Sequence, residues 1–349
     1  MNTPEQAFDL KAPKKAFSRI GFALVALLLV TFIAQFVLVV IIVAASQLLG
    51  QFYPDMTITS LSYSAAMFLS SITQYLIGFP VFYLIIKSLK TEAPQKFPCK
   101  ISTFIISFVI ATALMYMGQS IGNFVYIALY EWLGIDVSAT TLEALDSISL
   151  CESFIYLVIL APIVEEIMFR KLIISRTRMY GEKLSLFFSA LIFALFHMNP
   201  QQFFYSFFLG LLLGYLYLRR GKLLPCIILH AAVNFTSGII PLFIYRIVDI
   251  DAMTEIMLEE DVEAMIKMVE ENLLGYTFVS VYGLSLMALT LAGFIVYVIK
   301  TRKVTFKESS EQLPKDTEAT VAFTNVGVAL FILLAILFPI VSAYFTMKM

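Results

Sequence analysis

Charged residues are scarce in this chain. Only 14% of its 349 residues are charged and 60% are hydrophobic, with a mean hydropathy of +0.88. Soluble domains carry about a quarter charged residues and roughly half apolar ones. A water-soluble fold could not bury this much apolar surface, so the composition excludes an ordinary soluble protein and favours an integral membrane protein.

Cysteine and histidine are also rare. The three cysteines lie far apart at Cys99, Cys151 and Cys226 and form no CxxC pair, which argues against a disulfide framework and a thiolate metal site. The 24 basic and 25 acidic residues nearly cancel, so net charge does not indicate a nucleic-acid partner. The two histidines are His197 and His230, and their positions become important below.

Long apolar runs predict the fold class. Crossing a hydrocarbon core takes about 20 mostly apolar helical residues. On this criterion we expect an all-α, polytopic transmembrane helical bundle of about eight to nine spans. The segments are 20–49, 60–86, 101–130, 150–169, 184–198, 202–218, 223–245, 274–299 and 324–346, of which 184–198 is the shortest. The first is too long for a cleaved signal peptide.

The placement of basic residues predicts the orientation. Lys and Arg concentrate on the cytoplasmic side of membrane proteins. Here they cluster before the first span and after the second, fourth, sixth and eighth, while the other connections are nearly free of them. This alternation predicts a cytoplasmic N-terminus. The compact loops favour a bacterial plasma membrane.

These patterns divide the chain into five regions. We expect a cytoplasmic tail over 1–19, N-terminal transmembrane helices over 20–147, a core over 148–245, an acidic outer segment over 246–273, and C-terminal transmembrane helices over 274–349 with a flexible cytoplasmic linker at 301–322. The acidic segment predicts one amphipathic helix over 252–273, with Leu258, Val262, Met265 and Val269 on one face. This helix would be a solvated surface helix, or would lie on the membrane or cover an opening.

Ionisable residues inside the spans are the main functional clue. Each costs about 2.5–3.5 kcal/mol on insertion scales, so an intramembrane charge is by default a functional hypothesis. In this chain they gather in one third of the sequence. They are Glu165, Glu166, Arg170, His197 and His230, accompanied by Asn234.

The acidic pair divides into two roles. Glu166 and Arg170 are spaced i, i+4 and can form a structural ion pair along one helix face. Glu165 is offset by about 100° around the helix and has no partner at i±4. It is either a second structural acid or a general acid or base in an apolar site. If its helix spans about 153–178, with Arg170 inside it, Glu165 lies near the middle of the membrane.

The histidines have two interpretations each. His197 could be a hydrogen-bonded packing residue or a catalyst. His230 and Asn234 share a helix face, so they could donate hydrogen bonds to an oxyanion or simply join two helices. A packing role does not require the one unpaired acid and both histidines to share one compartment.

Three motifs in order carry a family resemblance. Residues 165–170 (EEIMFR), 193–197 (FALFH) and 230–234 (HAAVN) resemble the EExxxR, FxxxH and HxxxN motifs of the CPBP family. These are the CaaX-processing and bacteriocin-processing intramembrane proteases, also called the Abi family. The resemblance covers roughly residues 148–245 and does not extend to the flanking spans.

The resemblance implies peptide-bond hydrolysis inside the membrane. By analogy Glu165 and His197 would activate a water, and His230 with Asn234 would stabilise the oxyanion. Glu166, Arg170 and Phe193 would support the site. The family has also been described as metal-dependent, and Glu165, His197 and His230 would then be Zn²⁺ ligands. No HExxH pair is present, and we favour metal-free chemistry with no cofactor.

Partners and alternatives follow from the same residues. The expected partners are the lipid bilayer and a membrane-associated protein or peptide, such as a prenylated CaaX protein or a leader peptide. A non-catalytic immunity, scaffold or accessory protein of the same fold is the first alternative. A proton- or ion-coupled transporter is the second, against which the absence of inverted repeats counts.

Overall fold

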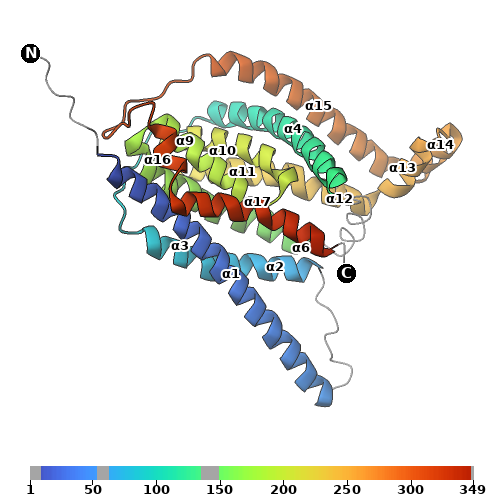
Figure 1. Ribbon diagram of the computed structural model, residues 1–349. Coiled ribbons are helices and arrows are strands. Elements are labelled where there is room, and N and C mark those ends of the chain that lie inside the picture. The colour runs from blue at the N-terminus through green and yellow to red at the C-terminus, as the bar shows by residue number, and fades with distance from the viewer. Residues whose placement is uncertain (1–8, 53–62, 135–148, 347–349) are drawn as a thin grey trace, which may run out of the picture.

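The computed structural model describes residues 9–52, 63–134 and 149–346 and places them in an all-helical bundle (Figure 1). No strand occurs in these three ranges. Large apolar side chains such as Phe36, Leu274 and Leu291 are exposed on the long helices. In water such surfaces would aggregate, whereas in lipid they meet a matching solvent. The predicted fold class, a transmembrane helical bundle, is confirmed.

The helical elements follow one another with short connections. Those before the central region are α1 (Lys11–Phe52), α2 (Tyr63–Thr73), η2 (Gln74–Gly78), α3 (Phe79–Ile86) and α4 (Ile101–Trp132). The central ones are α6 (Leu150–Ser153), η3 (Phe154–Leu160), α7 (Ala161–Glu165), η4 (Glu166–Ile174), α8 (Ser175–Thr177), η5 (Arg178–Tyr180), α9 (Glu182–Phe196), α10 (Pro200–Arg220), α11 (Leu224–Asn234), η6 (Phe235–Ile239) and α12 (Ile240–Ile247). The last are α13 (Ile250–Leu258), α14 (Val262–Glu271), α15 (Leu273–Thr301), α16 (Glu318–Phe323) and α17 (Val326–Thr346).

Each predicted span corresponds to a helical stretch, but the span count is not confirmed. Six helices are long and apolar enough to cross a membrane: Lys11–Leu48, Phe68–Ile86, Ile101–Trp132, Leu224–Ile247, Leu273–Thr301 and Val326–Ala343. The three stretches that do not meet this criterion are the composite helix over 150–180, α9 and α10, which carry more polar residues or are shorter. These are the helices that bear most of the intramembrane charges.

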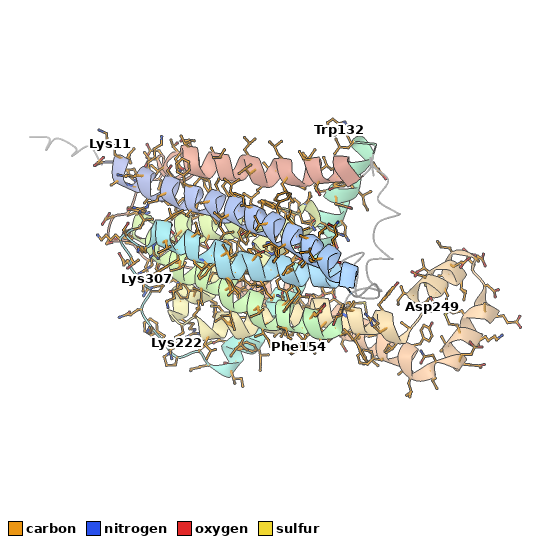
Figure 2. All side chains as sticks on the ribbon, turned by 90° about the horizontal axis from the view of Figure 1, so that it is seen from below. Lys11, Trp132, Phe154, Lys222, Asp249 and Lys307 are labelled. Carbon is orange, nitrogen blue, oxygen red and sulfur yellow. The ribbon has the colours of Figure 1, made fainter. Side chains whose placement is uncertain are left out.

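The bundle has two chemically different ends (Figure 2). Lys11, Lys222 and Lys307 lie at one end, which we call the basic end, and Trp132 and Asp249 lie at the other, which we call the acidic end. Helix α9 starts at the basic end and runs toward the acidic end, α10 returns, and α11 leaves the basic end again (Figure 1). The ends therefore separate the two sets of connections that the charge pattern distinguishes.

The acidic segment is not one helix. It forms two short helices, α13 and α14, because the chain turns at Glu259–Asp261, where Glu260 adopts a positive φ of 56°. Asp249 and Asp261 each accept a hydrogen bond from a backbone N–H in the first turn of the helix they precede. The prediction of a continuous helix over 252–273 is wrong, because the second N-cap signal at Asp261 restarts the helix.

The predicted flexible linker at 301–322 is also wrong. Backbone N–H groups of Glu311 and Leu313 donate to the carbonyls of Met179 and Tyr180, and Leu313 is buried. The N–H of Lys307 donates to Glu182, and α16 adds the buried Val321 to the core. Its polar composition indicated a solvated linker, but its polar groups instead bond to the basic ends of the core helices.

Glu182 is the centre of this basic-end network. Its carboxylate accepts from the N–H of Lys307 at 2.9 Å and from Arg178 at 3.1 Å, and it also pairs with Arg219. Burial favours the neutral acid, but the bonds from Lys307, Arg219 and Arg178 outweigh it and hold the pKa of Glu182 below its usual value. Nearby, Arg19 and Arg176 donate to the carbonyls of Ile85 and Ile86 at the end of α3.

Helices α4 and α10 pack through glycine. A Cβ on Gly122 would overlap the backbone of Gln201, and one on Gly118 would overlap that of Tyr205. The backbones can approach this closely only because these positions lack a side chain, as is common between membrane helices. The side chain of Gln201 also donates to Asn123 at 2.7 Å, which sets the register of the two helices.

We expect Gly122→Ala to destabilise the protein by about 1–3 kcal/mol, because the added methyl group overpacks the α4–α10 contact. The matched control is Gly283→Ala in α15, where a Cβ would meet nothing within 4 Å. Thermal unfolding of the purified protein in detergent measures both. Equal melting temperatures for the two variants would contradict the packing described.

We expect Glu182→Gln to lower the melting temperature at neutral pH more than Glu311→Gln, whose pair with Lys90 is exposed and worth less than about 1 kcal/mol. Because the pKa of Glu182 is lowered on folding, its stabilisation is present above the unfolded value of about 4.3 and is lost as the pH falls further. The gap between wild type and Glu182→Gln should therefore close in acid. A gap independent of pH would contradict this account.

Candidate active site

The helix that carries both glutamates is continuous but irregular. Residues 150–180 follow one helical path through α6, η3, α7, η4, α8 and η5, and two of its stretches are π-helical. Glu165 lies 15 residues from each end of this path. The expected longer helix, with Arg170 inside it, is thereby confirmed, and Glu165 is held near its middle.

Glu166 joins two other charged or polar groups of the core. Its Oε2 lies 3.1 Å from Nε of Arg170, and its Oε1 lies 3.0 Å from Nδ1 of His230. The side chains of Glu166 and Arg170 have no exposed surface. The ion pair expected from the i, i+4 spacing is present, and the contact with His230 was not foreseen.

The bond to Glu166 determines which nitrogen of His230 faces the site. A carboxylate only accepts, so Nδ1 of His230 carries the proton and Nε2 is directed away from Glu166. That Nε2 lies 3.8 Å from Oε2 of Glu165. This separation is too long for a direct hydrogen bond but allows a shared water or a small closure to connect the two groups.

His197 is oriented in a similar way. It ends α9 at the C-cap, and its Nδ1 lies 2.8 Å from the carbonyl oxygen of Phe193. Since a carbonyl only accepts, the neutral ring carries its proton on Nδ1 and presents a lone pair on Nε2. His197 is electrostatically coupled to Glu165, which places both groups in one compartment.

Phe193 separates the two imidazoles. Its ring meets His197 edge-on at 4.9 Å and His230 edge-on at 5.9 Å between ring centroids. The guanidinium of Arg170 lies 4.7 Å from the centre of the same ring. A cation over an aromatic face is attracted to it, so Phe193 also stabilises the buried Arg170.

Asn234 has a structural contact that its motif does not reveal. Its amide donates to the carbonyl of Leu157 at 2.8 Å. In a π-helical turn that carbonyl would receive the N–H of residue 162, which is a proline and has none. Asn234 therefore satisfies a carbonyl left open by Pro162 inside the membrane. Its second amide hydrogen is available to the cavity.

These side chains surround one cavity of about 500 Å³. Glu165, His197, His230, Asn234 and Phe193 all line it, whereas Glu166 and Arg170 lie behind it. Polar groups from outside the motifs complete the lining: Thr31, Gln35, Ser70, Gln74, Asn199, Gln202, Tyr205 and Ser206. A second cavity of about 690 Å³ near α12 and α15 is almost wholly apolar and contains none of the motif residues.

Sequence reasoning missed this second group of polar residues. Only ionisable groups were sought within the spans, and the neutral amides Gln35 and Gln74 lie in spans that contain no central charge. Tyr75 was missed as well. Its buried hydroxyl interacts with Glu165, and its ring stacks on Tyr156 at 6.2 Å. Polar amides within apolar runs were the available signal.

The donor set does not fit a metal centre as arranged. Among the described residues no group of three or more His, Cys, Asp or Glu side chains is placed to hold a metal ion. His230 lies 3.8 Å from Glu165, and its other nitrogen is taken by Glu166. The expected alternative ligands, Glu165, His197 and His230, share a cavity but do not form a coordination shell.

Comparison with known proteins agrees with the motifs. Residues 148–236 match the family model of type II CAAX prenyl endopeptidase Rce1-like proteins, and this segment carries all three motifs. The resemblance to the CPBP/CAAX protease family is confirmed for this core, and the family implies a protease, hence a hydrolase. No curated protein and no solved structure gives a significant match.

We expect Glu166→Gln to destabilise the protein by about 3–5 kcal/mol, because it leaves the charge of Arg170 buried without its partner. Glu165→Gln is the matched comparison: Glu165 has no such ion pair, so this variant should unfold close to the wild-type temperature. Thermal unfolding in detergent separates the two. A Glu166→Gln variant as stable as Glu165→Gln would show that the buried pair does not support the core.

Proposed function

We propose that the chain is an intramembrane endopeptidase in which Glu165 and His197 activate a water molecule. The observation that carries the proposal is the convergence of Glu165, His197 and His230 on one cavity within an apolar bundle. The three groups present a carboxylate and two imidazole lone pairs and no fixed positive charge. Such a set suits a water molecule, which has two hydrogens to donate.

The attacking step uses the carboxylate as general base. Glu165 takes a proton from the water while Nε2 of His197 accepts its second hydrogen bond and orients it. The water oxygen forms a bond to the carbonyl carbon of the scissile peptide, and the carbonyl oxygen becomes an oxyanion. The remaining N–H of Asn234 can donate to this oxyanion, and Nε2 of His230 can donate to it when the ring is protonated.

The second step returns the proton. Protonated Glu165 transfers its proton to the nitrogen of the leaving amine as the carbon–nitrogen bond breaks. The products are a new carboxylate and a new amine, and Glu165 is again ionised. Glu166 acts through His230 and Arg170 and touches neither water nor substrate, so it is a positioning residue.

The substrate class follows from the location of the site. A cavity within helices that face lipid accepts a membrane-associated protein or peptide. Prenylated CaaX-type proteins and leader peptides both meet this description. We further propose a bacterial plasma membrane with a cytoplasmic N-terminus, supported by the basic residues that collect at one end of the bundle (Figure 2).

Glu165→Gln tests the proposal directly. The glutamine keeps the shape of the side chain but cannot accept the proton, so the cleavage rate should fall by about 10²–10⁴-fold. Cleavage of a reporter peptide by the purified chain in proteoliposomes is the measurement, with thermal unfolding confirming that the variant is folded. Unchanged cleavage would contradict the proposal. A wild-type phenotype that survives Glu165→Gln in cells would favour a non-catalytic membrane protein.

The metal alternative is tested in the same assay. Because the three site residues do not form a coordination shell as arranged, we expect cleavage to persist after treatment with 1,10-phenanthroline and removal of the chelator. Loss of activity that Zn²⁺ restores would instead assign Glu165, His197 and His230 as metal ligands.

A further inference from the structure

The turn between α9 and α10 is recessed in the bundle. Helix α9 has 15 residues and is therefore only about 22 Å long. The first turn of α10 packs at Gly122 of α4, and α4 continues for ten more residues to Trp132, which adds about 15 Å. His197 and Asn199 thus lie well below the acidic end of the neighbouring helix.

The cavity extends only from this recess. On the helix over 150–180 its lining residues lie between Tyr156 and Glu165, and none lies beyond Glu165 toward the basic end. The same asymmetry holds on the other core helices. The lining residues begin at Phe193 on α9, end at Leu209 on α10, and begin at His230 on α11. Every core helix therefore contributes its acidic-end half.

The basic-end half is closed by packed apolar side chains. Phe169, Ile173, Phe188 and Ile192 have no exposed surface. The hydroxyl of Ser189 is buried among them and donates to the carbonyl of Phe169. The Glu182 network lies beyond this layer, so neither water nor a peptide has a route to Glu165 from the basic end.

The open half is lined with groups suited to a peptide backbone. Gln35, Gln74, Asn199 and Gln202 are amides that both donate and accept hydrogen bonds, and Ser70 accepts from Gln35 at 2.7 Å. None of these lining residues is charged. They can pair with peptide N–H and C=O groups as these leave water.

We propose that the site takes water and substrate from the acidic end of the bundle, and that its substrate is a membrane-associated peptide segment whose scissile bond lies in that half of the bilayer. The proposal rests on the proposed endopeptidase function for the word substrate, but the direction of access stands on the cavity alone. If basic residues mark the cytoplasmic side, cleavage occurs on the opposite side of the membrane. A segment confined to the basic side would have to cross the packed layer.

Cysteine labelling tests the direction of access in the full-length chain. Two native cysteines mark the faces: exposed Cys151 lies at the start of α6 near the acidic end, and half-buried Cys99 lies just before α4 at the basic end. A membrane-impermeant maleimide is applied to right-side-out and inside-out vesicles. Cys226 is buried and serves as an internal negative.

Two isosteric substitutions, each made with Cys99 and Cys151 replaced by serine, provide the matched pair. Ser70→Cys places a thiol in the cavity, and Ser189→Cys places one in the packed layer. We expect Ser70→Cys to be labelled from the face that labels Cys151 and not from the other, and Ser189→Cys to be labelled from neither. Labelling of Ser70→Cys only from the Cys99 face, or from neither face, would overturn the proposal.

This outcome is independent of catalysis. If labelling follows the expected pattern but Glu165→Gln still cleaves, the endopeptidase function fails and the direction of access stands. If Glu165→Gln is inactive but Ser70→Cys is labelled from the Cys99 face, the function stands and the direction of access fails.

Discussion

The carboxylate of Glu166 binds Arg170 with one oxygen and His230 with the other, in surroundings from which solvent is excluded. A charge in such a position is tolerated only when it is paired and hydrogen-bonded. Its bond to Nδ1 of His230 directs the other imidazole nitrogen toward Glu165. The guanidinium that neutralises it lies on Phe193, which in turn separates His230 from His197. The orientation of the proposed catalytic groups thus depends on this one side chain, which itself does not line the cavity.

The backbone around the site obeys the same requirement for internal partners. Pro162 removes an N–H from the helix that carries Glu165, and Asn234 supplies the missing donor to Leu157. The short α9 ends within the bundle, and its last turn leaves the carbonyl of Phe193 to His197. Both polar residues therefore satisfy backbone groups that lipid could not. The same contacts fix their positions at the cavity, so stability and proposed chemistry are linked in these residues.

Much of this arrangement could be predicted from the chain itself. Apolar runs located the helices, the i, i+4 spacing predicted the Glu166–Arg170 pair, and three motifs identified the family of the core. The contact between Glu166 and His230 could not be predicted, because it joins helices 64 residues apart in sequence. The break at Glu260 and the docking of residues around Leu313 were also missed. Each depends on a local cap or a tertiary partner that outweighs the average composition of its segment.

The central claim is that Glu165 delivers a water oxygen to a peptide carbonyl. Mass spectrometry of the products formed in heavy-oxygen water tests it most directly, with the purified chain in proteoliposomes and a membrane-anchored peptide. We predict one heavy oxygen in the new carboxyl terminus with the wild-type chain, and no product with folded Glu165→Gln. Product formation by Glu165→Gln at the wild-type rate would contradict the account.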